Sequence, residues 1–396
     1  MDLTRALEES SAPTLPPEAF DRVRAALDQG PLAAVDTLIA ELRQAEDFNN
    51  LFYALLLKKR VELGVSPFPT GPASELPPET HEPYEQAIRE AGRHVGQLYL
   101  DRGNFPKAWA FFRMLNEPEQ VQQALESYTP GESDDISPFI EIAWQNGLLP
   151  KKGFDLILER HGICSAITTV SSSDLNNNPD LRDHCVARLI RSLHEQLSER
   201  LRSDLEGRGM TVPASTSITE MVRMHPELFA EDAYHVDTSH LSSVVQMSLY
   251  MPKGPELEKA RDLCEYGKRL APGLKGHGEA PFEETFDDYL AFLDVVAGVN
   301  VDANLARFRE KAARESAEGS SYSSQVFVNL LVRAGREQDA LAAAREFLIA
   351  ENEQNLICPG VTELARRVGN FEAISEAGQA RSDGVQFLSG LLAARK

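Results

Sequence analysis

The sequence predicts an all-α protein built largely of helix-turn-helix pairs that stack side by side. Apolar residues recur at three- and four-residue spacing over most of the 396 residues, which is the spacing of amphipathic helices. Alternating runs rich in Val, Ile and Thr, typical of strands, are nearly absent. Several amphipathic segments end at a glycine, and a second helical pattern begins within about three residues of it.

The first 65 residues are expected to form helical hairpins. Pro16 and Pro17 suit a first helical turn, and Gly30 suits the stop of the helix EAFDRVRAALDQ that follows them. Two more amphipathic segments come next, PLAAVDTLIAELRQAED and FNNLFYALLLKKRVELG. The apolar run of the second segment is too short to cross a bilayer and indicates a packed core helix.

A proline-rich segment, residues 66–83, separates these hairpins from the rest of the chain. Its sequence, SPFPTGPASELPPETHEP, contains six prolines. Proline cannot donate a helical hydrogen bond, and it restricts the residue before it to extended backbone. The segment is therefore predicted to be an extended linker, either a flexible spacer or a strap packed along neighbouring helices.

Residues 84–148 and 281–396 contain segments that align on a glycine between two helical patterns. A small or aliphatic residue follows each glycine by five positions; the pairs are Gly103 with Ala108, Gly335 with Ala340, Gly369 with Ile374 and, more weakly, Gly30 with Val35. Glycine lets the chain turn, and a small side chain lets the second helix approach the first closely. Such hairpins bury their apolar faces only by stacking, which predicts a helical-repeat array.

The spacing of these glycines and alanines resembles the tetratricopeptide repeat, since Gly335 and Gly369 are 34 residues apart. The first segment also carries aromatic residues of the sort that this family packs between helices: Tyr99, Phe105, Trp109 and Phe112. The resemblance implies a right-handed α-solenoid with an inner and an outer surface. It also implies a protein or peptide partner, because members of the family bind peptides and build complexes.

Composition limits the classes of partner. Lys and Arg total 40 against 61 Asp and Glu, and the formal net charge is −21. This charge repels phosphate backbones and anionic membrane surfaces at long range, so neither nucleic acid nor a membrane is an expected partner. No stretch has the roughly 18 consecutive apolar residues of a membrane span, and the first residues lack the apolar core of a signal peptide. A cytoplasmic protein is expected.

The cysteines indicate no metal or disulfide framework. Cys164, Cys185, Cys264 and Cys358 lie far apart, without a CxxC pair. They are expected to be buried thiols that pack as small apolar groups. A nucleophilic Cys164 is the alternative, but no neighbouring residue in the sequence orients a base for it.

Residues 149–280 lose the repeat spacing and form the predicted irregular, histidine-rich helical middle. Seven of the nine histidines lie there: His161, His184, His194, His225, His235, His240 and His277. Gly162 is predicted to end one helix. A long helix is predicted from Pro179 to Glu206, because one apolar stripe contains Leu181, Cys185, Leu189, Leu193, Leu197 and Leu201.

The segment HVDTSH, residues 235–240, is the candidate site. Asp237 or Thr238 is predicted to cap a helix that has His240 in its first turn. His235, Asp237 and His240 are also the candidate ligands of a divalent metal ion, namely zinc, iron or manganese, since imidazole and carboxylate groups bind these ions. The spacing matches no tight motif such as HExxH, so further ligands are needed, and the candidates are Glu159, His161 and His184.

Two functions fit these patterns, and whether the protein is an enzyme stays open. The first is a protein- or peptide-binding scaffold. Arg182, Arg188 and Arg191 of the long helix would then supply positive charge for a carboxylate, unless they pair with acidic neighbours such as Glu195. The second is a metal-dependent enzyme, most simply a hydrolase, with its histidine and aspartate site in the concave face of the array. Nucleotide-binding and GxSxG hydrolase motifs are absent from the sequence.

Overall fold

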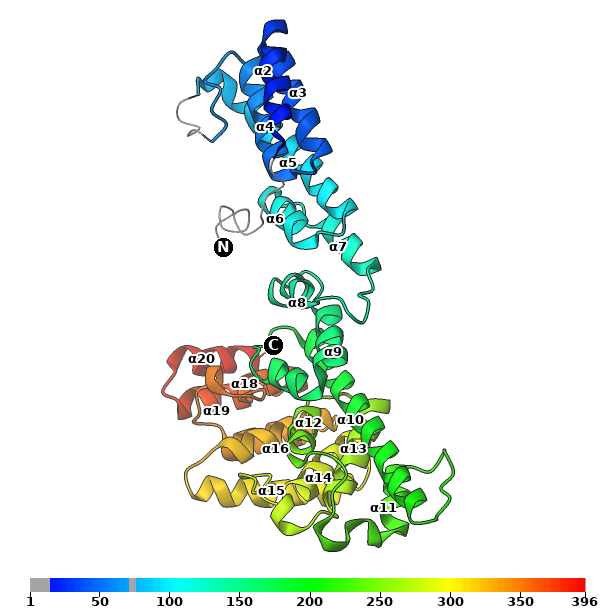
Figure 1. Cartoon of the computed structure of the whole chain (residues 1–396). Coiled ribbons are helices and arrows are strands. Elements are labelled where there is room, and N and C mark those ends of the chain that lie inside the picture. Colours follow the sequence, from blue (N-terminus) through cyan, green and yellow to red (C-terminus); the bar gives the residue numbers. More distant parts are fainter. Residues whose placement is uncertain (1–14, 71–75, 396) are drawn as a thin grey trace. The chain divides into compact units, whose positions relative to one another are not determined.

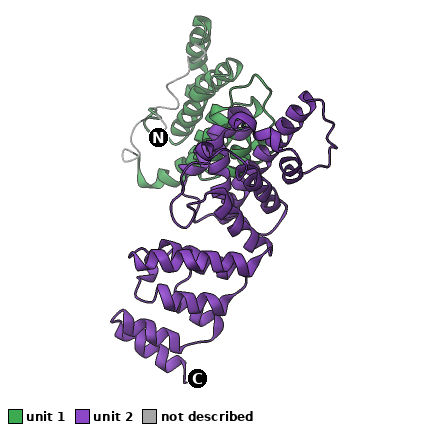
Figure 2. Cartoon of the chain, turned by 90° about the horizontal axis from the view of Figure 1, so that it is seen from below, with its two compact units in different colours: residues 1–157 green, residues 158–396 purple. Residues whose placement is uncertain are grey.

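The computed structural model describes residues 15–70 and 76–395, and within these ranges it contains helices, turns and loops but no β-strand (Figure 1). The predicted all-α class is therefore confirmed for this part of the chain. The first residues, where the sequence predicts no signal core, lie outside the described ranges, as do residues 71–75 of the proline-rich segment. The chain divides into two compact units, residues 1–157 and residues 158–396 (Figure 2).

Unit 1 is an array of helices in which neighbours along the chain pack against one another. Its buried apolar core includes Leu51, Val95, Phe111 and Phe112. The described helices that lie wholly in this unit are α2 (Pro17–Ala26), η1 (Leu27–Gln29), α3 (Pro31–Gln44), α4 (Phe48–Glu62), α5 (Pro78–Asp101), α6 (Phe105–Leu115), α7 (Glu119–Ser127), α8 (Ser137–Ile140) and η3 (Glu141–Gln145).

Unit 2 begins within α9 (Pro150–Ser171) and has two parts. The first is the histidine-rich region, with α10 (Pro179–Gly207), α11 (Ile218–Met224), η4 (Pro226–Asp232), α12 (Thr238–Ser248), α13 (Pro255–Gly267) and η5 (Pro272–Leu274). The second is a run of helices, each packed against the next: α14 (Phe286–Ala297), α15 (Val301–Ala317), α16 (Tyr322–Arg333), α17 (Glu337–Phe347), α18 (Val361–Val368), α19 (Glu372–Ala380) and α20 (Gly384–Ala393), with η6 (Glu353–Asn355) before α18. Figure 2 shows the last of these as successive antiparallel pairs.

The predicted glycine turns are confirmed. Gly103, Gly335 and Gly369 have φ values of 69°, 72° and 74°, each between two helices that pack together. This left-handed backbone is strained for other residues, which explains why glycine occupies the turn. The residues five positions later, Ala108 and Ala340 among them, are buried in the second helix of each pair. The helix-turn-helix pairs at both ends of the chain therefore exist as the sequence predicts.

The extended part of the proline-rich segment is shorter than predicted. Residues 66–83 were expected to be extended, but α5 starts at Pro78 and continues through Pro83. Proline is tolerated in a first helical turn because its missing N–H has no partner there in any case. The start of the helix is held from α4, since the buried Arg60 donates through Nε to the hydroxyl of Tyr84 at 2.9 Å and its guanidinium lies 4.8 Å from the centre of the Tyr84 ring.

The two predictions made for helices of the middle region are confirmed. α10 runs from Pro179 to Gly207, with its amino end capped by the side chain of Asn178, which accepts from the N–H of Leu181 at 3.1 Å. The predicted stripe is its buried face: Leu181, Cys185, Leu189, Leu193, Leu197 and Leu201. α9 is interrupted at Gly162, where φ is 80° and ψ is 175°. The glycine thus ends one helical segment, as predicted, and a second begins directly after it.

Candidate functional site

His235, the first residue of HVDTSH, is engaged by protein groups at both ring nitrogens. Its Nε2 lies 3.2 Å from Oδ2 of Asp204 on α10, and its Nδ1 lies 3.2 Å from the hydroxyl of Tyr266 on α13. The same hydroxyl accepts the backbone N–H of His235 at 2.7 Å. Burial raises the pKa of Tyr266 to about 12, so the phenol stays neutral. His235 therefore links α10 to α13 with its polar atoms already paired.

Asp237 is the helix cap that the sequence predicts. Its side chain accepts from the backbone N–H groups of Ser239 at 2.8 Å and His240 at 3.3 Å, at the start of α12. Hydrogen bonds from the Ser239 side chain and from these two N–H groups lower the pKa of Asp237 below its ordinary value. The carboxylate thus satisfies the free N–H groups of a helix end.

The other three predicted metal ligands lie on three different helices, and His240 is half-buried in the first turn of α12. His161 is exposed beside the interruption of α9, and His184 is half-buried on α10. Within the described residues, no group of three or more His, Cys, Asp or Glu side chains is arranged to hold a metal ion. The divalent-metal site of His235, Asp237, His240, His161 and His184 stays a prediction. In the structure, His235 forms hydrogen bonds to Asp204 and Tyr266, and Asp237 caps α12.

The cysteines depart from expectation at one position. Cys185, Cys264 and Cys358 are buried, as predicted, whereas Cys164 is exposed. Ala166 and Ile167 form the buried side of this part of α9. Cys164 instead lies one turn before Thr168, which is also exposed, so the two residues share the solvent-facing side of the helix.

Unit 2 contains a cavity of about 640 Å³ among α10, α12, α14 and α16. Residues of the loop after α9 and of the segment after α12 complete its wall. The volume lies in the range typical of ligand pockets. We call it the arginine cavity, because Arg182 and Arg333 are its charged lining residues and none of the described residues that line it is acidic.

Arg333, on α16, is one of the two positively charged residues that line this cavity. Its guanidinium donates to the backbone oxygens of Leu249 and Met251, just beyond the end of α12, and lies 5.4 Å from the centre of the Phe292 ring. Burial, and next the positive charge of Arg182, lower the pKa of Arg333 to about 10. The group is still charged at neutral pH.

Arg182, on α10, supplies a second guanidinium to the lining of the cavity. It lies 4.8 Å from the centre of the Tyr250 ring, a cation–π arrangement. Its Nε and Nη2 donate to one oxygen of the adjacent Asp183, at 3.1 Å and 2.9 Å. Stacking on the ring and pairing along one edge fix the plane of the guanidinium. Of the three arginines noted in the sequence, Arg182 lines the cavity, whereas Arg191 pairs with Glu256 on α13.

Aromatic and amide side chains make up much of the remaining wall. Tyr250, Tyr322 and Ile357 are exposed at the cavity, whereas Phe282 and Phe292 are buried. Asn176, Gln246 and Asn329 add amide groups that both donate and accept. Such a surface offers apolar contact, directional hydrogen bonds and positive charge in one place. It suits a ligand with apolar and acidic groups close together.

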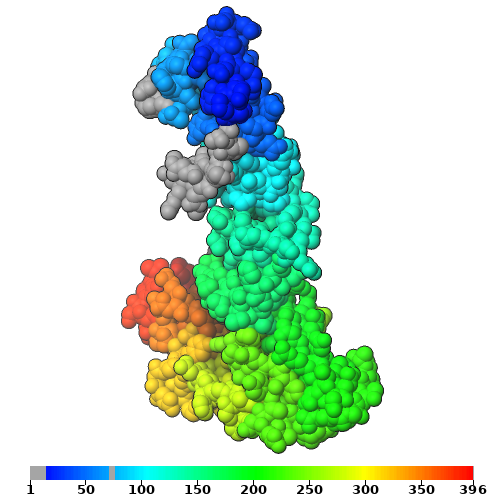
Figure 3. Space-filling view, in the orientation of Figure 1, coloured from blue at the N-terminus to red at the C-terminus, as the bar shows by residue number. Residues whose placement is uncertain are grey.

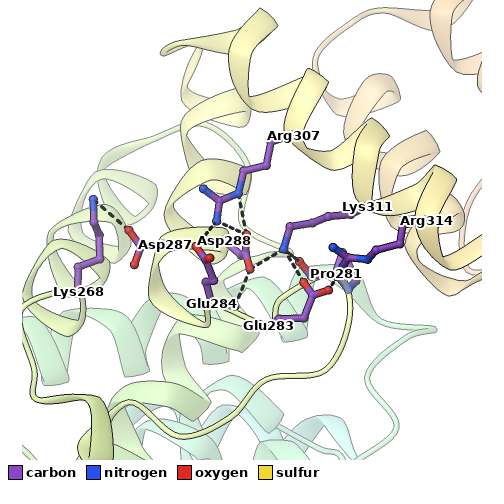
Figure 4. A network of polar contacts seen from close by, with 9 residues as sticks. All are labelled: Lys268, Pro281, Glu283, Glu284, Asp287, Asp288, Arg307, Lys311 and Arg314. Carbon is purple, nitrogen blue, oxygen red and sulfur yellow. Dashed lines mark hydrogen bonds and ion pairs between the residues drawn. The ribbon is translucent and has the colours of Figure 1, made fainter.

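A buried ionic network holds the loop that brings Phe282 to the cavity. Asp288 of α14 accepts from Arg307 and Lys311 of α15, each at 2.8 Å, and from the backbone N–H of Glu284 at the same distance (Figure 4). Lys311 also donates to the backbone oxygen of Pro281 at 2.7 Å. These contacts pin residues 281–284 against α14 and α15. The ring of Phe282 then stacks on that of Tyr289, with 4.8 Å between centres.

The sequence analysis selected one charged residue of this cavity, Arg182, and did not select Arg333 or the aromatic lining residues. Arg182 was selected because it belongs to an arginine cluster on the long helix. Arg333 ends a helix whose apolar pattern predicts only burial, and its partners Leu249 and Met251 lie more than eighty positions earlier in the chain. No sequence motif marks the exposed Tyr250 and Tyr322 as binding residues. Only the packing of α12 against α14, and of α14 against α16, brings these residues together.

No protein-family model, no curated protein and no solved structure matches the chain. A separate observation concerns membranes: none of the helices in the described ranges is both long enough and apolar enough to cross one.

Proposed function

We propose that the protein is a protein- or peptide-interaction scaffold, built as a right-handed α-solenoid of tetratricopeptide-like hairpins, and that the arginine cavity binds a partner segment. One observation carries the proposal: in a chain of net charge −21, the charged residues lining this cavity are two arginines. Acidic residues exceed basic ones by 21, from 61 against 40. The described lining of the cavity contains no acidic residue, although the adjacent Asp183 pairs with Arg182, so the lining is positive in an otherwise acidic chain.

The lining chemistry defines the segment that fits. A fixed guanidinium binds carboxylates with directional, charge-assisted hydrogen bonds. Exposed aromatic rings supply contact area at low entropic cost, as they do at interaction hot spots. We therefore expect a segment with Asp or Glu next to an aliphatic or aromatic residue. The acidic group would lie near Arg182 and the apolar group near Tyr250 and Tyr322.

A displayed library of random peptides, selected on the full chain, tests this proposal. Wild-type protein is expected to enrich peptides that combine an acidic residue with an adjacent apolar residue. The Arg182→Met variant keeps an apolar stem on Tyr250 but loses the charge, and we expect it to bind the enriched peptides at least about tenfold more weakly.

The matched control is Arg191→Met, on the same helix, which removes an ion pair with Glu256 outside the cavity. Its affinity for the peptides is expected to equal that of the wild type. Binding by wild type should also weaken as salt rises, because the charge attraction is screened. If the selected peptides lack acidic residues, or if the Arg182→Met variant binds them as tightly as the wild type does, the proposal that this cavity binds an acidic segment is refuted.

A further inference from the structure

The last described helix of unit 2, α20, packs against its neighbour through glycine residues. Its partner is α19, and the contact is made through small residues. A methyl group placed at Gly390 would lie 2.5 Å from the backbone nitrogen of Ser375, and one at Gly378 of α19 would collide with the backbone of Phe387. The two helices therefore approach backbone to backbone. The side of α20 that faces α19 is a glycine surface rather than a leucine surface.

The large apolar side chains of α20 consequently face outward. Val385, Leu388 and Leu392 are 79%, 55% and 56% exposed, and Leu391 is exposed as well. At about 100° per residue these four positions occupy an arc of about 120°, the width of a stripe that normally faces a protein core. We call this the α20 stripe. The helix that carries it, α20, lies at the red end of the chain in the space-filling view (Figure 3).

Charge restricts what can cover the stripe. The ten residues of α20, GVQFLSGLLA, include no charged side chain, although charged residues make up 26% of the chain. An interfacial membrane helix would carry Lys and Arg on its polar face, whereas α20 has none and its other face is occupied by α19. The stripe is therefore suited to another uncharged, apolar protein surface.

The ends of the helix supply the argument for the occupant. Asp383 precedes the first turn and caps it, accepting from the N–H groups of Val385 and Gln386 at 3.0 Å each, and Arg395 follows the last turn. When two such helices lie antiparallel, the Asp383 end of each meets the Arg395 end of the other. A parallel pair would place like charges together. Asp383 and Arg395 lie at the two ends of the helix, beside the stripe, so an antiparallel contact with a second copy turned by 180° brings opposite charges together at both helix ends.

We propose that the α20 stripe is a self-association surface, which pairs with the α20 stripe of a second copy of this chain in an antiparallel, two-fold symmetric contact. Leu388 lies near the two-fold axis, and Val385 of each copy meets Leu392 of the other. One short helix buries less area than a standard interface, and two chains of charge −21 repel each other. The dimer is therefore expected to be weak, with a Kd on the order of 10–100 μM.

Sedimentation equilibrium of the full chain measures this association. The wild type is expected to shift from monomer to dimer across this range, and to keep doing so in about 0.5 M salt, since the contact is apolar. Leu388→Glu places two like charges together at the axis and is expected to raise the Kd at least about tenfold. The control is Leu32→Glu, at an exposed leucine of α3 in unit 1, which should leave the Kd unchanged. A wild type that stays monomeric up to about 500 μM would overturn the proposal.

Cysteine cross-linking tests the orientation. In a Cys164→Ser background, which removes the exposed native thiol, Val385→Cys and Leu392→Cys proteins are mixed under air with a copper catalyst, so that oxygen oxidises paired thiols to a disulfide. The antiparallel contact predicts a cross-linked dimer in the mixture and little from either variant alone. Cross-linking of each variant with itself, without a mixed species, would show a parallel contact and refute the proposed geometry.

Discussion

The buried carboxylate of Asp288 offers a sharp test of how unit 2 holds its loop. Its side chain is 0% exposed, and it accepts three hydrogen bonds, from Arg307, from Lys311 and from the backbone N–H of Glu284. A second nitrogen of Arg307, Nη2, lies 2.6 Å from the same carboxylate as an ion pair. The change to examine is Asp288→Asn, which keeps the shape of the side chain and removes its charge. The amide would then present N–H donors to groups that are themselves donors.

The size of the effect follows from these contacts. A hydrogen bond to a charged group is worth about 1.5 to 3 kcal/mol, and breaking a buried ion pair by removing one partner costs about 3 to 5 kcal/mol. Lys311 keeps Glu283 and the Pro281 oxygen as partners, which offsets part of the loss. We therefore expect Asp288→Asn to lower the free energy of unfolding of unit 2 by about 3 kcal/mol.

Urea unfolding followed by hydrogen exchange measures this change within unit 2, because exchange reports each region separately. The matched control is Asp287→Asn, at the next residue, whose partner Lys268 lies 3.6 Å away in a partly exposed pair. An exposed pair is worth about 0 to 1 kcal/mol. Equal destabilisation by the two variants, or a loss below about 1 kcal/mol for Asp288→Asn, would show that the buried network does not hold this loop.

Three further predictions concern packing, capping and acid stability. Gly96→Ala should lower thermal stability by about 1 to 3 kcal/mol because its methyl would lie 2.8 Å from the ring of Phe112, whereas Gly207→Ala, with nothing within 4 Å, should not. Asp237→Ala should cost about 1 kcal/mol in urea unfolding, and Asp237→Asn, which keeps the cap, almost nothing; a metal ligand would not tolerate the amide. Burial would raise the pKa of Asp262, but hydrogen bonds from His194 and Thr219 lower it below the ordinary 3.8. The stability it contributes is therefore complete above pH 3.8 and lost as pH falls below that value, and Asp262→Asn should flatten the acid limb of a plot of unfolding free energy against pH.

The helical architecture was predictable because its signals are local. The stripe of α10 requires only a 3.6-residue period, and the turns at Gly103, Gly335 and Gly369 require only a residue that tolerates positive φ. The start of α5 was misplaced because prolines were taken as a barrier throughout residues 66–83. Tertiary packing of Tyr84 against Arg60 helps to hold the helix start instead.

The environments of the candidate site residues were much less predictable, because each depends on contacts between residues that are far apart in the sequence. The histidines drew attention through their chemistry, yet His194 pairs with Asp262 and His235 with Asp204, and the sequence does not show that these segments are neighbours. Composition identifies which side chains can bind a ligand. Only the packing shows which of them are already paired with the protein.

If a partner segment binds the arginine cavity as proposed, the net charge of −21 constrains how that segment reaches it. At physiological salt, electrostatic interactions between exposed groups extend about 8 Å, so an acidic segment meets repulsion from the surrounding surface before it reaches Arg182. Association is then slower than for a neutral pair, and affinity depends on a slow dissociation once the aromatic wall and the guanidinium are engaged. A partner that carries basic residues on either side of its acidic, apolar core would overcome this barrier, because its flanks are attracted to the outer surface while its core is attracted to the cavity. The pattern expected in a natural partner is therefore an acidic and apolar centre between basic flanks.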